Sequence, residues 1–181
     1  MIETREHRSC PLEVRSKGRT LEGHAAVFGQ AARIGGFTES IRAGAFASTL
    51  RSAGDILALV DHDAGKLLAR TKSGTLRLAE DSQGLAFALD VPDTQTGRDI
   101  LALAERGDLG GASFGFTVPK GGDAWTGTTR ELRSVTLHEI SIVLGWPAYA
   151  GTNVAARSLA HGVTLRARLA ATWLQTHGGR A

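Results

Sequence analysis

The sequence predicts a mostly β domain, barrel-like and accompanied by a few helices, followed by a basic helical tail. The chain of 181 residues contains 23 Gly and only four Pro. Its short apolar runs are separated by Gly, Asp and Ser, which is typical of strands joined by tight turns. A chain of this length buries roughly 70% of its unfolded surface without a disulfide or metal. We therefore expect one β-barrel domain over residues 1–154 and a tail over residues 155–181.

Seven segments have the spacing of strands. Apolar residues in segment 85–91 fall on one face, and those in segment 111–118 alternate with Ser113 and Gly115. Segment 139–144 alternates in the same way. The other expected strands are residues 20–28, 56–61, 67–71 and 75–80.

Helices are expected to be few. Residues 96–106 carry an apolar stripe with helical spacing, Thr94 or Thr96 can cap its start, and Gly107 can end it. Residues 119–128 have the composition of an exposed hairpin loop. The other two expected helices are residues 44–51 and 155–175.

The charge is unevenly distributed. The net charge is +3, but the tail has no acidic residue, so removing its four arginines leaves 17 basic against 18 acidic residues in the expected domain. A domain with a net charge of about −1 is not a strongly basic module that grips nucleic acid. The tail arginines are Arg157, Arg166, Arg168 and Arg180.

Targeting signals are not evident in the sequence. No apolar run approaches the ~20 residues of a membrane-spanning helix. The first ten residues are charged and lack the apolar stretch of a signal peptide. The single cysteine, Cys10, cannot form an internal disulfide or a cysteine-rich zinc site. We therefore expect a cytoplasmic protein that does not bind membranes.

The segment Gly110-Gly-Ala-Ser-Phe-Gly-Phe116 is the first candidate for chemistry. Glycines beside Ser113 allow close approach of a substrate, and backbone N–H groups at Gly110 and Gly111 are candidates for an oxyanion pocket. The alternative is a glycine-rich strand with an incidental serine. The segment also matches G-x-S-x-G, but that motif needs a strand before the serine and a helix after it. The order here is reversed, so an esterase-type hydrolase is the weaker interpretation.

His62 and Glu139 are candidate partners of this serine. His62 ends an apolar strand in Leu-Val-Asp-His-Asp, which suits a general base, although a solvated turn histidine is the alternative. Glu139 lies within an apolar strand, where a carboxylate needs a partner such as a histidine N–H or Arg133. His138 competes with Glu139 for this third position, but alternation places it on the opposite face.

A zinc site is an alternative use of the same side chains. His62, Asp63, His138 and Glu139 are suitable ligand types. No HExxH or other ligand spacing accompanies them. We therefore expect neither a metal nor a cofactor.

Five segments, in this order, resemble the prohead (capsid maturation) serine proteases of tailed bacteriophages. Together they cover roughly residues 20–153, at spacings compatible with that family. They include the Ser113 segment and the Leu-Val-Asp-His-Asp segment quoted above. The other three are Gly23-His-Ala-Ala-Val-Phe28, Glu39-Ser-Ile-Arg-Ala-Gly-Ala-Phe46, and Leu137-His-Glu-Ile-Ser-Ile-Val143 with Pro147-Ala-Tyr149.

The resemblance implies a fold similar to herpesvirus assemblin, a small closed β-barrel surrounded by a few helices. It also implies a serine endopeptidase inside the procapsid that cleaves scaffold or the N-terminal scaffolding segment of the major capsid protein, and such enzymes often also cleave themselves. Residue by residue, His62 matches the general base, Ser113 the nucleophile and Glu139 the acidic position. Herpesvirus enzymes use a second histidine there, so His138 stays as the alternative third member.

The sequence leaves several alternatives open. A non-catalytic capsid-assembly or scaffold module would require Ser113, His62 and Glu139 to lie apart. The basic tail suits docking on an acidic scaffold partner, a self-cleavage site, or a plain helix packed on the domain. The Ala- and Arg-rich composition suggests a high-GC bacterial host, for which a prophage and a gene transfer agent fit equally. The number of copies in any homo-oligomer is not determined by the sequence.

Overall fold

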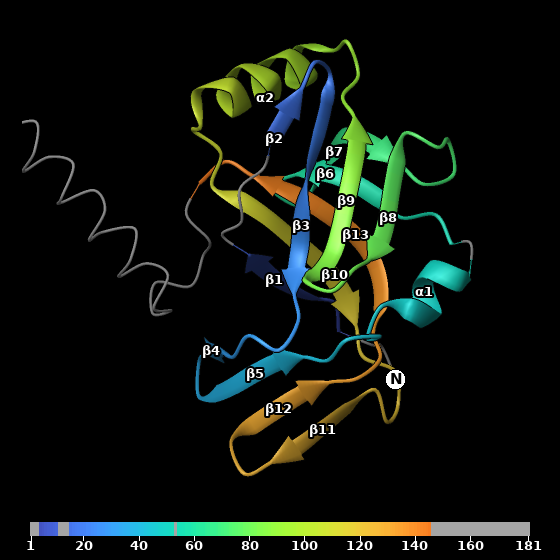
Figure 1. Ribbon diagram of the computed structural model, residues 1–181, viewed down its shortest axis with the longest axis vertical. Coiled ribbons are helices and arrows are strands. Elements are labelled where there is room, and N and C mark those ends of the chain that lie inside the picture. Colours follow the sequence, from blue (N-terminus) through green and yellow to red (C-terminus); the bar gives the residue numbers. More distant parts are fainter. Residues whose placement is uncertain (1–3, 11–14, 53, 146–181) are drawn as a thin grey trace, which may run out of the picture. The chain divides into compact units, whose positions relative to one another are not determined.

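The computed structural model describes residues 4–10, 15–52 and 54–145 (Figure 1). The expected helix over residues 155–175, and with it the basic tail, lies outside the described residues. Within the described part of the chain, no helix has the length and apolar character needed to cross a membrane.

The described strands form three sheets, so the expected mostly β class is confirmed. Their pairings do not close into one ring, and a closed barrel is not seen among these strands. Short strands with alternating faces suit packed sheets as well as a barrel, so alternation alone does not distinguish the two.

The first sheet has the order β1 (Glu6–Cys10), β10 (Gly111–Thr117), β13 (Thr136–Val143), β6 (Leu57–Val60), β7 (Asp63–Arg70). The second has the order β2 (Arg15–Lys17), β3 (Thr20–Val27), β9 (Gly84–Asp90), β8 (Leu76–Glu80). The third has the order β11 (Asp123–Thr126), β12 (Thr129–Leu132), β5 (Phe37–Ile41), β4 (Ala32–Ile34).

One hydrophobic core joins the first two sheets. The apolar face of β10 contributes Phe114 and Phe116, whose rings stack with centroids 5.0 Å apart. Phe46 meets Phe114 edge to face, with centroids 5.4 Å apart. The alternation read from the sequence therefore places the intended side chains inside. Further core residues are Leu21, Leu85, Phe87, Leu89, Ala112, Ile140 and Ile142.

The two described helices, α1 (Ala47–Arg51) and α2 (Gln95–Arg106), lie where the sequence predicts them. Thr94 is the cap of α2, because its hydroxyl accepts a hydrogen bond from the Gly97 N–H. Gly107 ends the helix in the left-handed conformation, with φ of 73°. Glycine suits this position because it has no Cβ to clash there.

The expected hairpin loop over residues 119–128 is partly wrong. Residues 123–126 form β11, which pairs antiparallel with β12. The strands β1, β2, β4, β5 and β12 were also not predicted. These strands have three to five residues and polar sequences, so each carries too few apolar positions to show a period of two.

Three neighbouring strands position the candidate site. β10 and β13 pair antiparallel, with Ser113 opposite Ser141 and Gly115 opposite Glu139. These four residues therefore share the face that is turned away from Phe114. β6 runs parallel to β13 and ends at Val60, opposite Ile142. The chain then turns directly into His62.

Candidate active site

His62 occupies a sharp turn between β6 and β7. Asp61 and His62 both have positive φ, 48° and 60°, which is uncommon for residues with a side chain. Two bonds to β13 hold the turn: the Asp61 N–H donates to the Ile142 carbonyl at 3.0 Å, and Asp61 Oδ1 accepts from the Leu144 N–H at 3.0 Å. Asp61 thus fixes the turn, and the imidazole is held over the polar face of β10 and β13.

The structure brings Ser113, His62 and Glu139 into one hydrogen-bonded chain. His62 Nε2 lies 2.8 Å from Ser113 Oγ. The other ring nitrogen, His62 Nδ1, lies 2.6 Å from Glu139 Oε1. A hydroxyl, an imidazole and a carboxylate are therefore in direct contact, in the order that acyl-transfer chemistry requires.

Ser141 supports this chain and was not singled out as a site residue from the sequence. Its hydroxyl accepts a hydrogen bond from the His62 backbone N–H at 2.8 Å and donates to Glu139 Oε2 at 3.2 Å. Ser141 is fully buried. Alternation does place it on the face of Glu139, so a search for polar residues sharing that face would have found it.

Glu139 is held as a carboxylate. Burial raises its pKa, but the hydrogen bond and charge of His62, together with the Ser141 hydroxyl, outweigh burial and lower the pKa below its ordinary value. An ionised Glu139 accepts the Nδ1–H of His62 and leaves Nε2 facing Ser113 as the free acceptor. This is the tautomer that a general base needs.

His7, on β1, is a second histidine at Glu139. His7 Nδ1 lies 3.3 Å from Glu139 Oε1, and the rings of His7 and His62 are 4.1 Å apart between centroids. Burial and the neighbouring His62 lower the pKa of His7, against the opposing effect of Glu139. Among the described residues, His7, His62 and Glu139 form the one group with metal-ligand spacing. The zinc ligands considered from the sequence, which include Asp63 and His138, are therefore not brought together.

The site is more enclosed than strand alternation alone indicates. Ser113 and Glu139 lie on the faces of their strands opposite the apolar core, yet Ser113 is 0% and Glu139 2% exposed. His62 retains 25% exposure. The difference arises because β1, which was not predicted, pairs with the outer edge of β10. The Ser113 hydroxyl also lies 2.7 Å from the Arg8 carbonyl oxygen of β1.

The alternative partners lie elsewhere. His138 Nε2 lies 3.1 Å from the Thr117 hydroxyl, whereas the carboxylate at His62 Nδ1 is that of Glu139. Arg133 pairs with Glu131 rather than with Glu139. Strict alternation does not hold at His138, because Gly115 pairs with Glu139 and Phe116 with Leu137, which leaves His138 as the extra residue of a bulge in β13.

Gly110 and Gly111 lie at the entry to β10. The Gly110 N–H donates to the Val143 carbonyl at 2.7 Å, so in this conformation it is not open to an oxyanion. A Cβ at Gly110 would lie 2.1 Å from the Gly145 carbonyl oxygen, and this close approach requires glycine. Gly111 has φ of 130°, a conformation that residues with side chains rarely adopt.

The structure lacks the elements that a G-x-S-x-G nucleophile elbow requires around Ser113, so that interpretation is wrong. β10 continues beyond Ser113 to Thr117, and it pairs antiparallel with both of its neighbours. A nucleophile elbow needs a helix directly after the serine and a parallel sheet.

Gly115 makes the space that Glu139 occupies. A Cβ at this position would lie 2.4 Å from Glu139 Oε1. Because His62 and Ser141 hold that carboxylate, Gly115→Ala is expected to displace it and to lower peptidase activity by about 10²-fold, as misplacements near 1 Å do. Cleavage rate and thermal unfolding of the variant measure the effect.

Gly36→Ala is the matched control, because a Cβ there meets nothing within 4 Å and Gly36 does not have positive φ. Activity of Gly115→Ala equal to that of Gly36→Ala would show that the Glu139 position does not matter for turnover.

Comparison with known proteins adds a family to this geometry. The sequence model of the Caudovirus prohead serine proteases matches residues 8–164, which is most of the chain. Comparison with curated proteins gave no significant match, and comparison with solved structures gave none either. Because the family match spans well over half of the sequence, the chain belongs to the Caudovirus prohead serine proteases and is a serine peptidase.

Proposed function

We propose that this peptidase cleaves scaffold or the N-terminal scaffolding segment of the major capsid protein, as well as itself, with Ser113 as nucleophile, His62 as general base and Glu139 as orienting acid. The observation that carries the assignment is the unbroken contact chain from Ser113 Oγ through both ring nitrogens of His62 to Glu139. Membership of the prohead protease family supports capsid proteins as substrates and the procapsid interior as the place of action.

The proposed reaction uses one proton path. Ser113 Oγ attacks the scissile carbonyl while Nε2 of His62 takes the hydroxyl proton. Glu139 stabilises the imidazolium that results, and its lowered pKa keeps it charged for this task. His62 then gives the proton to the departing amine. A water molecule, activated in the same way, releases the acyl group from Ser113.

The tetrahedral intermediate needs backbone donors. Gly110 is engaged with Val143, so we assign this role to the start of β10 at Gly111 rather than to both glycines. We also propose that the fold is similar to that of herpesvirus assemblin. This similarity is supported by a nucleophile and a histidine that approach each other from neighbouring parts of one sheet.

Co-expression with a major capsid protein that carries its scaffolding segment tests the function. We expect mass spectrometry to find a new N-terminus on the capsid protein, formed only when the peptidase is present. A capsid protein that stays at full length beside well-folded peptidase would contradict the proposed substrate.

A further inference from the structure

Strand β1 occupies the edge of β10 on which the nucleophile lies. The two strands pair antiparallel, with Ser9 opposite Ser113 and His7 opposite Gly115. Ser113 is 0% exposed, and its hydroxyl lies 2.7 Å from the Arg8 carbonyl oxygen. A peptide substrate must bring its own carbonyl to that hydroxyl. Substrate and β1 therefore compete for the same place.

The Arg8 carbonyl also competes for the proton of the nucleophile. Ser113 has one hydroxyl hydrogen and two acceptors within reach, Nε2 of His62 at 2.8 Å and the Arg8 oxygen at 2.7 Å. When the hydroxyl donates to Arg8, it does not donate to His62. The contact with β1 thus opposes the proton transfer that would start the reaction.

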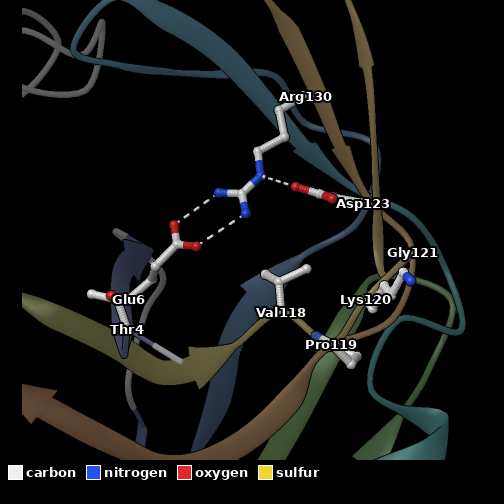
Figure 2. Close-up of a pocket in the computed structure, with 8 residues that line it drawn as sticks. All are labelled: Thr4, Glu6, Val118, Pro119, Lys120, Gly121, Asp123 and Arg130. Atoms are coloured by element: carbon white, nitrogen blue, oxygen red, sulfur yellow. Dashed lines mark hydrogen bonds and ion pairs between the residues drawn. The ribbon is translucent and has the colours of Figure 1, made fainter. Parts of the chain in front are cut away.

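Buried ion pairs hold β1 in this position. The Arg8 guanidinium binds both oxygens of Glu39, with Nε and Nη2 at 2.6 and 3.0 Å. Glu6 makes a two-pronged pair with Arg130, at 2.8 and 3.0 Å, which Figure 2 shows reaching from β1 towards β12. Arg130 is also bonded to Asp123. We call these five residues the β1 clamp.

The charge of Glu39 in the β1 clamp influences which strand can replace β1. Glu39 is 3% exposed, and without Arg8 its side-chain bond among the described residues is the one from Arg130, at 3.1 Å. Asp123 also binds this Arg130 guanidinium. Removing a guanidinium from a buried carboxylate is costly unless another cation takes its place. Arginine matches a carboxylate in a two-pronged geometry. A strand that replaces β1 is therefore favoured when it brings a basic side chain to Glu39.

We propose that β1 is an intramolecular pseudosubstrate: it holds the β10 edge to which an extended substrate peptide pairs, and Glu39 selects a basic side chain at the substrate residue whose carbonyl faces Ser113. Main-chain pairing to an open sheet edge gives such a site affinity, and the side-chain pocket gives it specificity. This inference rests on the proposed function, because it takes Ser113 as the nucleophile.

The rate at which a small fluorophosphonate labels Ser113 tests the blocking role of β1. In this reaction Oγ bonds to phosphorus, fluoride leaves and His62 takes the proton. We compare full-length wild type with Arg8→Ala, which loosens the clamp and leaves the three site residues unchanged. Labelling of Arg8→Ala should be at least about tenfold faster, because the state with β1 in place loses a charge-assisted pair. Arg77→Ala is the matched control, since Arg77 makes a two-pronged but exposed pair with Asp90, and it should label like wild type.

Arg8→Lys guards against loss of the fold. It keeps a cation at Glu39 but not the two-pronged geometry, so its labelling rate should fall between those of wild type and Arg8→Ala. Equal and rapid labelling of wild type, Arg8→Ala and Arg8→Lys would overturn the pseudosubstrate role of β1. Failure of every chain to label at Ser113, with folding intact, would instead contradict the nucleophile and so the proposed function.

A peptide of residues 4–9, Thr-Arg-Glu-His-Arg-Ser, tests the selection by Glu39. It should slow the labelling of Arg8→Ala, and the same peptide with Glu at the position of Arg8 should require at least about tenfold more for the same effect. In the double variant Arg8→Ala/Glu39→Gln that preference should shrink. Equal protection by both peptides in Arg8→Ala would overturn Glu39 as the selecting residue.

Discussion

Ser113→Ala is expected to abolish cleavage of the capsid protein, with turnover falling by several orders of magnitude. The proposed mechanism requires Ser113 to form the acyl intermediate, and loss of a triad nucleophile costs about 10⁶-fold in comparable enzymes. The hydroxyl is buried and bonded to Arg8, so we expect the free energy of unfolding to change by only about 1–2 kcal/mol. The measurement is the rate of capsid-protein cleavage with purified components, alongside chemical denaturation.

Ser73→Ala serves as the control for this change. Ser73 lies on an exposed turn and its hydroxyl bonds only locally, to Arg70 and Thr75. Its variant should cleave like wild type. Normal processing by Ser113→Ala would remove the serine from the mechanism.

Glu139→Gln is expected to lower turnover by about 10²-fold or more, by analogy with triad acids. Glutamine preserves the shape, but its neutral side chain no longer stabilises the charged imidazole of His62, which lies 2.6 Å from the carboxylate. Because this stabilisation matters mainly in the transition state, the effect should appear in kcat rather than in KM.

His138→Ala is the comparison that separates the two candidate third members. His138 Nε2 lies 3.1 Å from the Thr117 hydroxyl, whereas Glu139 lies 2.6 Å from His62 Nδ1, so loss of His138 should change turnover far less than Glu139→Gln does. Cleavage that survives Glu139→Gln and disappears in His138→Ala would assign the site to the herpesvirus His–Ser–His type.

Alternation predicts most of what the site needs. The period of two in β10 and β13 puts Ser113 and Glu139 on one face, which is how the structure arranges them, but it does not predict the bulge at His138. The apolar run of β6 places His62 at a strand end. These features follow from sequence because each depends on local spacing within a strand.

The burial of the site was not predictable in the same way. It depends on β1, which is five residues long, polar and about one hundred residues away in sequence from its partner β10. Nothing in the local pattern of residues 6–10 identifies that partner. The ion pair between Arg8 and Glu39 could not be predicted for the same reason, because it joins side chains from strands that meet only in the folded chain.

Cooperation between the serine and the histidine is measured by comparing the cleavage rates of Ser113→Ala, His62→Ala and the chain carrying both changes. If Ser113 and His62 act as one unit, either single change removes the shared proton transfer and the second change costs little more. We therefore predict that the double variant cleaves the capsid protein no more slowly than Ser113→Ala alone. Losses that multiply in the double variant would mean that the two residues act independently, which contradicts the proposed Ser113–His62–Glu139 mechanism.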